Sequence, residues 1–239
     1  MAQAEIEEVN GRVRFGREFG NRALAWLGVS RYFGEVQPQV GPQFPALDFD
    51  GGEWTAGLEY DHLDNLFLPR EGALAGIRYI RSTEALGADQ DFEQVLVNGL
   101  VAGSRGRHSA LAALRFNTTL DDDAPVYAVF TGGGFLNMSG FEPAELSGQH
   151  FGVATLGYRY QVGRSGFLPG YVGGTVEYGN AAQDRDDVFG DGLWNGSLYF
   201  AYDTPIGPLY LGWGWSEDRS GLLFLRLGAI LGSEAIGRR

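Results

Sequence analysis

The sequence contains no cysteine and no lysine, and no long hydrophobic run. The absence of cysteine excludes a disulfide framework and a thiolate metal site. No apolar run approaches the ~18 residues of a transmembrane helix, and the N-terminal stretch lacks the apolar segment of a secretory signal. These two absences do not exclude an exported protein if the chain is a piece cut from a longer one. The net charge of −12 excludes nucleic acid as a partner, because phosphate binding requires basic patches.

The acidic residues gather in short runs, such as 89–91, 121–123 and 184–187. Runs of this kind are usually solvated loops. A calcium site requires ligands at a defined spacing, which these runs do not show. We therefore predict no metal site and no cofactor.

What the sequence has in abundance is alternation of apolar and polar residues with a period of two, which predicts β-strands. In 209–216, Leu209, Leu211, Trp213 and Trp215 share one face, while Tyr210, Gly212, Gly214 and Ser216 share the other. About eleven segments predict strands in this way. They are 12–19, 22–33, 53–61, 72–81, 92–102, 108–117, 151–162, 170–179, 193–203, 208–216 and 221–230.

The composition of the two strand faces separates a soluble sandwich from a membrane barrel. The polar face carries glycine, threonine, asparagine, glutamine and isolated arginines, and the apolar face carries aromatic residues near strand ends. This is the pattern of a transmembrane β-barrel. The aromatic residues expected to face lipid are Trp54, Trp194, Trp213 and Trp215, and the arginines expected to face inward are Arg78, Arg115, Arg159 and Arg226.

The predicted connections broadly alternate between short and long, as in outer-membrane barrels. The long ones are 34–52, 118–150 and 180–192, and the short ones include 20–21, 103–107, 163–169 and 204–207. The fold class is thus an all-β, antiparallel transmembrane barrel of the bacterial outer membrane, spanning 1–239. Bacterial single-chain barrels have an even number of strands, and an open edge in lipid is costly. An odd count therefore means that further strands are missing from this chain or that the count is off by one.

Two turns carry a resemblance to a known family. The segment YDHLDNLFLPREG (60–72) resembles the turn motif of the bacterial surface antigen superfamily, and DTPIGPLYLGWGW (203–215) resembles its penultimate hairpin. The motif positions in these turns are Tyr60, Asp61, Asp64, Asn65, Pro69 and Gly72, followed by Pro205, Gly207 and Pro208. The superfamily comprises outer-membrane barrels of assembly factors and two-partner secretion transporters.

A narrower resemblance joins the segment 132–160 to the TPIGPLYLGWG hairpin. Together they look like the C-terminal barrel of patatin-like phospholipases of the type V autotransporter group. This resemblance implies the C-terminal part of a 16-stranded barrel that anchors, and helps to export or display, an N-terminal domain. The implied partners are outer-membrane lipid, the barrel-assembly machinery, and that attached domain or the missing strands.

The resemblance also assigns a role to the loop 118–150, which would enter the barrel lumen. In the wider family an arginine–glycine pair at the loop tip contacts an acidic residue of the wall. Here the tip reads Met138–Ser139–Gly140–Phe141, with serine in place of arginine. Glu177 matches the acidic wall position and would face inward with Thr175 and Gly179. We expect a serine–carboxylate hydrogen bond where the family has a salt bridge.

Catalytic residues are not predicted in this chain. A patatin enzyme needs a serine in a G-x-S-x-G turn, which the sequence lacks. His108 and Ser109 are adjacent, and neighbouring strand residues point to opposite faces. His62 and His150 lie in or beside loops, where no motif places a serine. A solute channel and an outer-membrane hydrolase remain the alternatives to an anchor.

Overall fold

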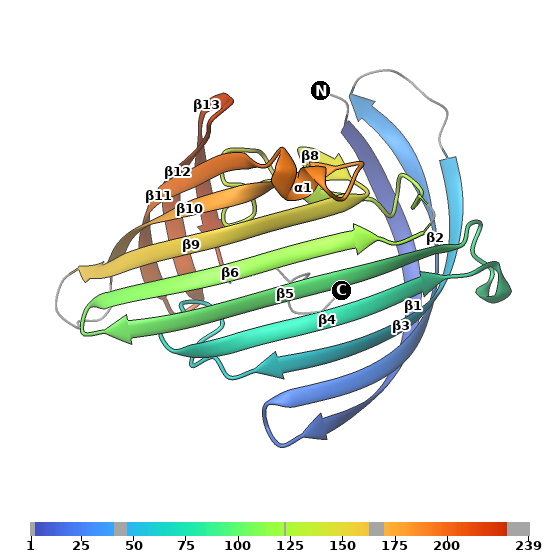
Figure 1. Cartoon of the computed structure of the whole chain (residues 1–239), viewed down its shortest axis with the longest axis horizontal. Coiled ribbons are helices and arrows are strands. Elements are labelled where there is room, and N and C mark those ends of the chain that lie inside the picture. The colour runs from blue at the N-terminus through green and yellow to red at the C-terminus, as the bar shows by residue number, and fades with distance from the viewer. Residues whose placement is uncertain (1–2, 41–46, 122, 163–169, 229–239) are drawn as a thin grey trace. The chain divides into compact units, whose positions relative to one another are not determined.

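Strands make up most of the chain in the computed structural model, which describes residues 3–40, 47–121, 123–162 and 170–228. Eleven strands form one antiparallel sheet in which sequence neighbours pair, except that β9 follows β6 (Figure 1). In sheet order they are β1 (Gln3–Phe19), β2 (Ala23–Val40), β3 (Leu47–Asp61), β4 (Gly72–Ser82), β5 (Phe92–Arg105), β6 (His108–Thr119), β9 (His150–Val162), β10 (Gly170–Ala182), β11 (Leu193–Thr204), β12 (Gly207–Ser216) and β13 (Arg219–Leu227).

The remaining elements are short. A two-stranded sheet of β7 (Phe130–Gly132) and β8 (Leu146–Gly148) lies within the connection between β6 and β9. The 3-10 helix η1 (Glu84–Leu86) follows β4, and the helix α1 (Asp187–Gly190) follows β10. Among the described residues, no helix has the length and apolar character needed to cross a membrane.

The first two strands are longer than the sequence pattern predicts. β2 continues to Val40 and β3 begins at Leu47, so the predicted long connection 34–52 is wrong. The extra pairs include Glu7 with Glu35, whose charged side chains interrupt the apolar alternation. Backbone hydrogen bonds between strands do not depend on side-chain type, and this is why periodicity alone ends these strands too early. The connection 163–169 and the end of the predicted strand 221–230 lie outside the described residues.

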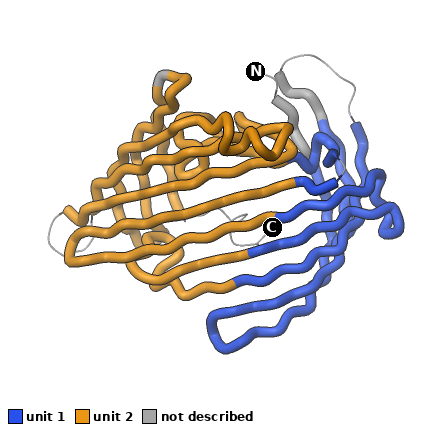
Figure 2. Tube along the Cα trace, in the orientation of Figure 1, with its two compact units in different colours: residues 1–59, 77–95, 119–129 blue, residues 60–76, 96–118, 130–239 orange. Residues whose placement is uncertain are grey.

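The chain folds as two compact units, which share the strands from β3 to β6 (Figure 2). Unit 1 comprises residues 1–59, 77–95 and 119–129, and unit 2 comprises 60–76, 96–118 and 130–239. In unit 1, Tyr32, Val36 and Phe49 form a small buried cluster on which Tyr127 packs. The rings of Phe49 and Tyr127 stack with their centroids 4.1 Å apart.

In unit 2 the two faces of the sheet differ in the way the alternation predicts. Leu156, Leu198 and Leu211 expose 66%, 60% and 56% of their surface on one face. Thr155, Glu177 and Ser197 are buried on the other face, where alternation places them. A continuous exposed apolar face of this kind indicates contact with another apolar phase.

The part of the 120–149 connection that belongs to unit 2, residues 130–149, packs on the polar face of that unit. Its residues Phe130, Met138 and Phe141 pack on Phe151 and Val153 of β9 in one buried cluster. A second cluster is built around Phe135 of the same connection, with Leu68 of the β3–β4 turn and strand residues Tyr171, Tyr199, Ala201 and Tyr210. The β3–β4 and β6–β9 connections follow strands that run in opposite directions, so they leave the sheet at opposite ends. Their residues Leu68 and Phe135 nevertheless pack in the same cluster.

Candidate functional site

The candidate site is the contact between the tip of the 120–149 connection and the strand wall at Glu177. The backbone N–H groups of Met138 and Ser139 donate to Glu177 Oε2 at 2.9 and 2.8 Å. The hydroxyl groups of Ser139 and Thr175 both donate to Glu177 Oε1. Glu177 is completely buried. Four neutral donors thus satisfy both oxygens of one buried side chain.

The backbone of the tip is held in a tight local fold. Leu136 and Met138 have φ angles of 62° and 78°, a left-handed conformation that costs non-glycine residues free energy. The Ser139 hydroxyl accepts from the N–H of Leu136 at 3.0 Å, so this one side chain links the internal turn to the wall. Arg115 of β6 donates to the Asn137 side chain at 2.9 Å.

Two glycines allow the tip to touch the strand backbone. A Cβ atom at Gly140 would lie 2.5 Å from both the Ser216 nitrogen and the Trp215 carbonyl carbon. A Cβ atom at Gly214 would lie 1.9 Å from the Ser139 carbonyl oxygen. Both distances are shorter than any non-bonded contact. The Gly140 N–H also donates to the Asn195 side chain at 3.3 Å.

The other predicted wall residues fall into two groups. Thr175 contacts Glu177 directly and shares a 2.7 Å hydrogen bond with Ser197 of β11. Gly179 instead faces its neighbour strand, because a Cβ atom there would lie 1.9 Å from the Gly152 carbonyl oxygen of β9. Asn195 and Gly214 are parts of the site that the sequence pattern did not identify.

A second attachment holds the returning limb of the connection. Arg219, at the start of β13, forms an ion pair with Glu145, whose side chain is only 8% exposed. The Arg219 guanidinium also lies 5.1 Å from the centroid of the Phe141 ring. These residues are far apart in sequence, and no local pattern predicts their contact.

Replacing Arg219 with alanine is expected to loosen this limb and to lower the stability of the folded protein by about 1 kcal/mol, as for a partly exposed ion pair with an aromatic contact. Thermal unfolding in detergent, followed by gel mobility, measures the loss. Arg105→Ala removes an exposed arginine at the end of β5 and serves as the control. Equal losses in the two variants would show that the ion pair contributes nothing specific.

The first turn motif builds a compact connection between β3 and β4. Asp64 Oδ1 accepts from the backbone N–H groups of Arg70 and Glu71 at 2.8 and 3.0 Å. Partial burial acts to raise the pKa of the Asp64 carboxyl, but these N–H donors outweigh it and hold that pKa below its ordinary value. Asn65 Oδ1 accepts from the N–H groups of Phe67 and Leu68 at 2.7 and 3.1 Å.

The same turn is tied to the polar face of the sheet. Arg159 donates to the Pro69 carbonyl at 2.5 Å, and the Tyr210 hydroxyl donates to the Phe67 carbonyl at 2.9 Å. Gly72 has a φ angle of 112°, which favours glycine. At the strand end, Asp61 Oδ1 accepts from the Leu63 N–H at 3.0 Å; the neighbouring Tyr60 is exposed.

The second motif forms the β11–β12 hairpin. Pro205 lies in its turn, and Gly207 has a φ angle of 114°. The Thr204 hydroxyl donates to the Gly207 carbonyl at 2.5 Å. The carbonyl of Pro208, a buried residue, accepts from the Gly228 N–H at 2.9 Å.

His108 and Ser109, the adjacent pair weighed from the sequence, make separate hydrogen bonds. His108 is exposed and bonds the Tyr158 hydroxyl at 2.6 Å, while Ser109 is buried and bonds Ser104 at 2.8 Å. His150 bonds Thr118 at 2.7 Å, a pair that the sequence did not indicate. Within the part of the chain that the structure describes, His, Asp and Glu side chains form no cluster of three that fits a metal ion.

An antiparallel sheet with an exposed apolar face and a polar face covered by an inserted connection defines a class, the β-barrel membrane proteins. The family model described as the Omp85 superfamily domain matches residues 2–216, and the chain belongs to this superfamily. It is a bacterial outer-membrane barrel protein, which confirms the predicted fold class and location. The resemblance to the surface antigen barrels is confirmed at this superfamily level.

One solved structure shows the same fold. It is BamA from Haemophilus ducreyi lacking POTRA domains 1–3, with a TM-score of 0.71 and 13% sequence identity. The match covers 95% of this chain and 53% of that one, so this chain spans about half the length of the BamA chain. No curated protein matches the sequence. The fold is an Omp85 barrel, which is not a known enzyme fold.

Proposed function

We propose that this chain is the membrane anchor of a larger outer-membrane protein and helps to export or display an attached N-terminal domain. The observation that carries this proposal is the packed polar face of unit 2. Phe135 of the long connection and Leu68 of the β3–β4 turn share a buried cluster with Tyr171 and Tyr210. A face filled by side chains from both of its ends suits an anchor better than an open channel.

The arginines of the polar face support the same conclusion. Arg159 is buried and bonded to the Pro69 carbonyl, and Arg115 is bonded to Asn137 of the loop. Both arginines hold inserted segments. In a solute channel, the same side chains would instead be exposed to water. This is the expected role of charges facing a polar lumen, since a charge facing lipid near the bilayer centre costs about 2–4 kcal/mol.

The proposal includes further strands beyond this chain. In the sheet order of the described residues, β1 and β13 are the outermost strands. An unpaired strand edge in lipid leaves backbone groups without hydrogen-bond partners. Further strands of the same protein would supply these hydrogen-bond partners and bring the barrel to 16 strands, as in the related barrels. The barrel-assembly machinery would insert the complete barrel. A patatin-like domain is the passenger that the narrower resemblance favours; its G-x-S-x-G serine is absent from this chain.

The experiment uses intact cells that produce the full-length protein. Protease added to the outside should remove a displayed N-terminal domain and leave the barrel as a protected fragment. The purified barrel should give little conductance in a planar bilayer. An N-terminal domain that is cut only after the membrane is permeabilised would overturn display, and steady conductance would favour the channel.

A further inference from the structure

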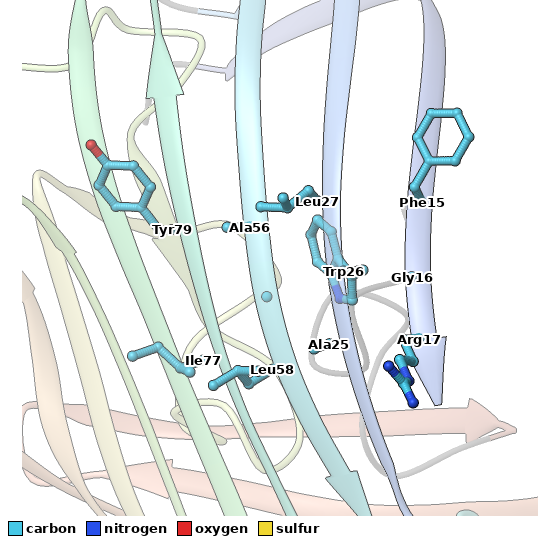
Figure 3. A pocket seen from close by; sticks show the side chains of 11 residues that line it. Phe15, Gly16, Arg17, Ala25, Trp26, Leu27, Ala56, Leu58, Ile77 and Tyr79 are labelled. Atoms are coloured by element: carbon cyan, nitrogen blue, oxygen red, sulfur yellow. The ribbon is translucent and has the colours of Figure 1, made fainter. Parts of the chain in front are cut away.

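A groove of about 590 Å³ crosses the apolar face of β1 to β4 in unit 1 (Figure 3). Its volume falls in the ~300–1,000 Å³ range of sites for small ligands. The apolar lining comes from Phe15, Ala25, Leu27, Ala56, Leu58, Ile77 and Tyr79, with Gly16, Arg17, Trp26 and Gly57 completing it. The small side chains of Ala25 and Ala56 lie between the large ones, and this difference in size creates the depression.

The groove lies on the surface that contacts the membrane. Phe15 and Leu27, which pair across β1 and β2, are 78% and 66% exposed, and Leu58 is 60% exposed. Trp26, between Ala25 and Leu27, is buried and donates to Glu59 at 2.9 Å, so alternation assigns its ring to the opposite, polar face. The groove is therefore open to lipid hydrocarbon.

One end of the groove carries a charge. Arg17 is an exposed residue on the same face of β1 as Phe15 and Phe19. It pairs with Ala25 just before the β1–β2 turn, and its guanidinium lies 5.5 Å from the centroid of the Phe19 ring. A lipid-facing arginine is tolerated close to the membrane surface and costly near the centre, and its long side chain reaches toward the headgroups.

The groove leads away from this charge. Ala56 and Leu58 lie a few residues before β3 ends, on the side of the sheet where the β1–β2 turn lies. On β4 the lining continues away from that side, from Ile77 to Tyr79 (Figure 3). The lining thus runs obliquely from a cation at the membrane surface into an apolar trough. A phosphate group at Arg17 and an acyl chain along Ala56 and Ile77 match this arrangement in charge and in polarity.

We propose that the groove is a binding site for one anionic phospholipid, with its phosphate at Arg17 and one acyl chain between β1 and β4. Unlike bulk lipid, this phospholipid stays bound when the protein is extracted from the membrane. The protein as a whole has a formal net charge of −12, so it does not attract anionic lipid in general. A local site is needed to hold one.

Native mass spectrometry of the folded protein tests this proposal. The protein is released from micelles that contain equal amounts of phosphatidylglycerol and phosphatidylethanolamine with identical acyl chains. We expect one retained phosphatidylglycerol per chain. Ala56→Phe should fill the trough and lower the retained fraction about fivefold or more, because excluding one or two methylene groups has an effect of this size. Ala154→Phe is the matched control, since Ala154 is an exposed alanine on the apolar face of β9.

Arg17→Ala should remove the preference for phosphatidylglycerol over phosphatidylethanolamine, while Arg17→Lys should keep it. Heat-dependent gel mobility confirms that each variant is folded. Three results would each overturn the proposal: equal retention by the Ala56→Phe and Ala154→Phe proteins, an unchanged lipid preference in Arg17→Ala, or a lipid-free dimer that Ala56→Phe dissociates. The last result would assign the groove to a second copy of the chain.

Discussion

Replacing Glu177 with alanine is expected to detach the loop tip from the strand wall and to be one of the most destabilising single changes in the chain. The substitution removes the acceptor for the N–H groups of Met138 and Ser139 and for the hydroxyls of Ser139 and Thr175. Each buried donor left without a partner costs about 1–3 kcal/mol. We therefore expect a loss of about 3 kcal/mol or more in the free energy of unfolding.

Denaturant unfolding in detergent, followed by gel mobility and by protease cleavage within 120–149, measures this loss. Glu177→Gln should cost less than Glu177→Ala, since one amide oxygen still accepts. Glu18→Ala removes an exposed glutamate of β1 and should have little effect. Ser139→Ala combined with Glu177→Ala tests the contact itself, because groups in contact give non-additive effects. Additive losses would mean that the two residues act independently.

Gly140→Ala is the second change with a large expected effect. Its new methyl group would meet the backbone of Trp215 and Ser216 at 2.5 Å, and β12 cannot yield without losing its pairing with β11 and β13. Overpacking in a closed core costs about 1–3 kcal/mol, and displacement of the tip would add the loss of the Glu177 hydrogen bonds. We expect faster protease cleavage in the loop and a lower unfolding temperature.

The chain offers a matched control for this substitution. Gly103 lies in β5 with no atom within 4 Å of an added Cβ, so Gly103→Ala should leave stability nearly unchanged. Gly214→Ala approaches the same contact from the wall, with its Cβ 1.9 Å from the Ser139 carbonyl oxygen. It should produce the same loop cleavage as Gly140→Ala. An intact, protease-resistant loop in both variants would contradict the close approach described above.

The strands and their two faces were predictable because alternation is a local property. The exposed Trp54, Trp194 and Trp213 follow from the same pattern. The extra length of β1 and β2 was not predictable, since it depends on backbone pairing between charged residues. The placement of Ser139 beside Glu177 came from a resemblance and not from the pattern. The Arg219–Glu145 pair and the Leu68–Phe135 cluster join distant segments, and a single sequence carries no signal for them.

The contacts of the loop tip also set an order of events during assembly. Ser139 bonds a residue 38 positions further along the chain, and Gly140 bonds one 55 positions further. Contacts across long separations form late, because the entropy of closing the intervening chain is lost first. The surface that contacts the tip is complete only after β10, β11 and β12 have paired with one another. These three strands, which follow the loop in the chain, therefore decide when the loop reaches its final position.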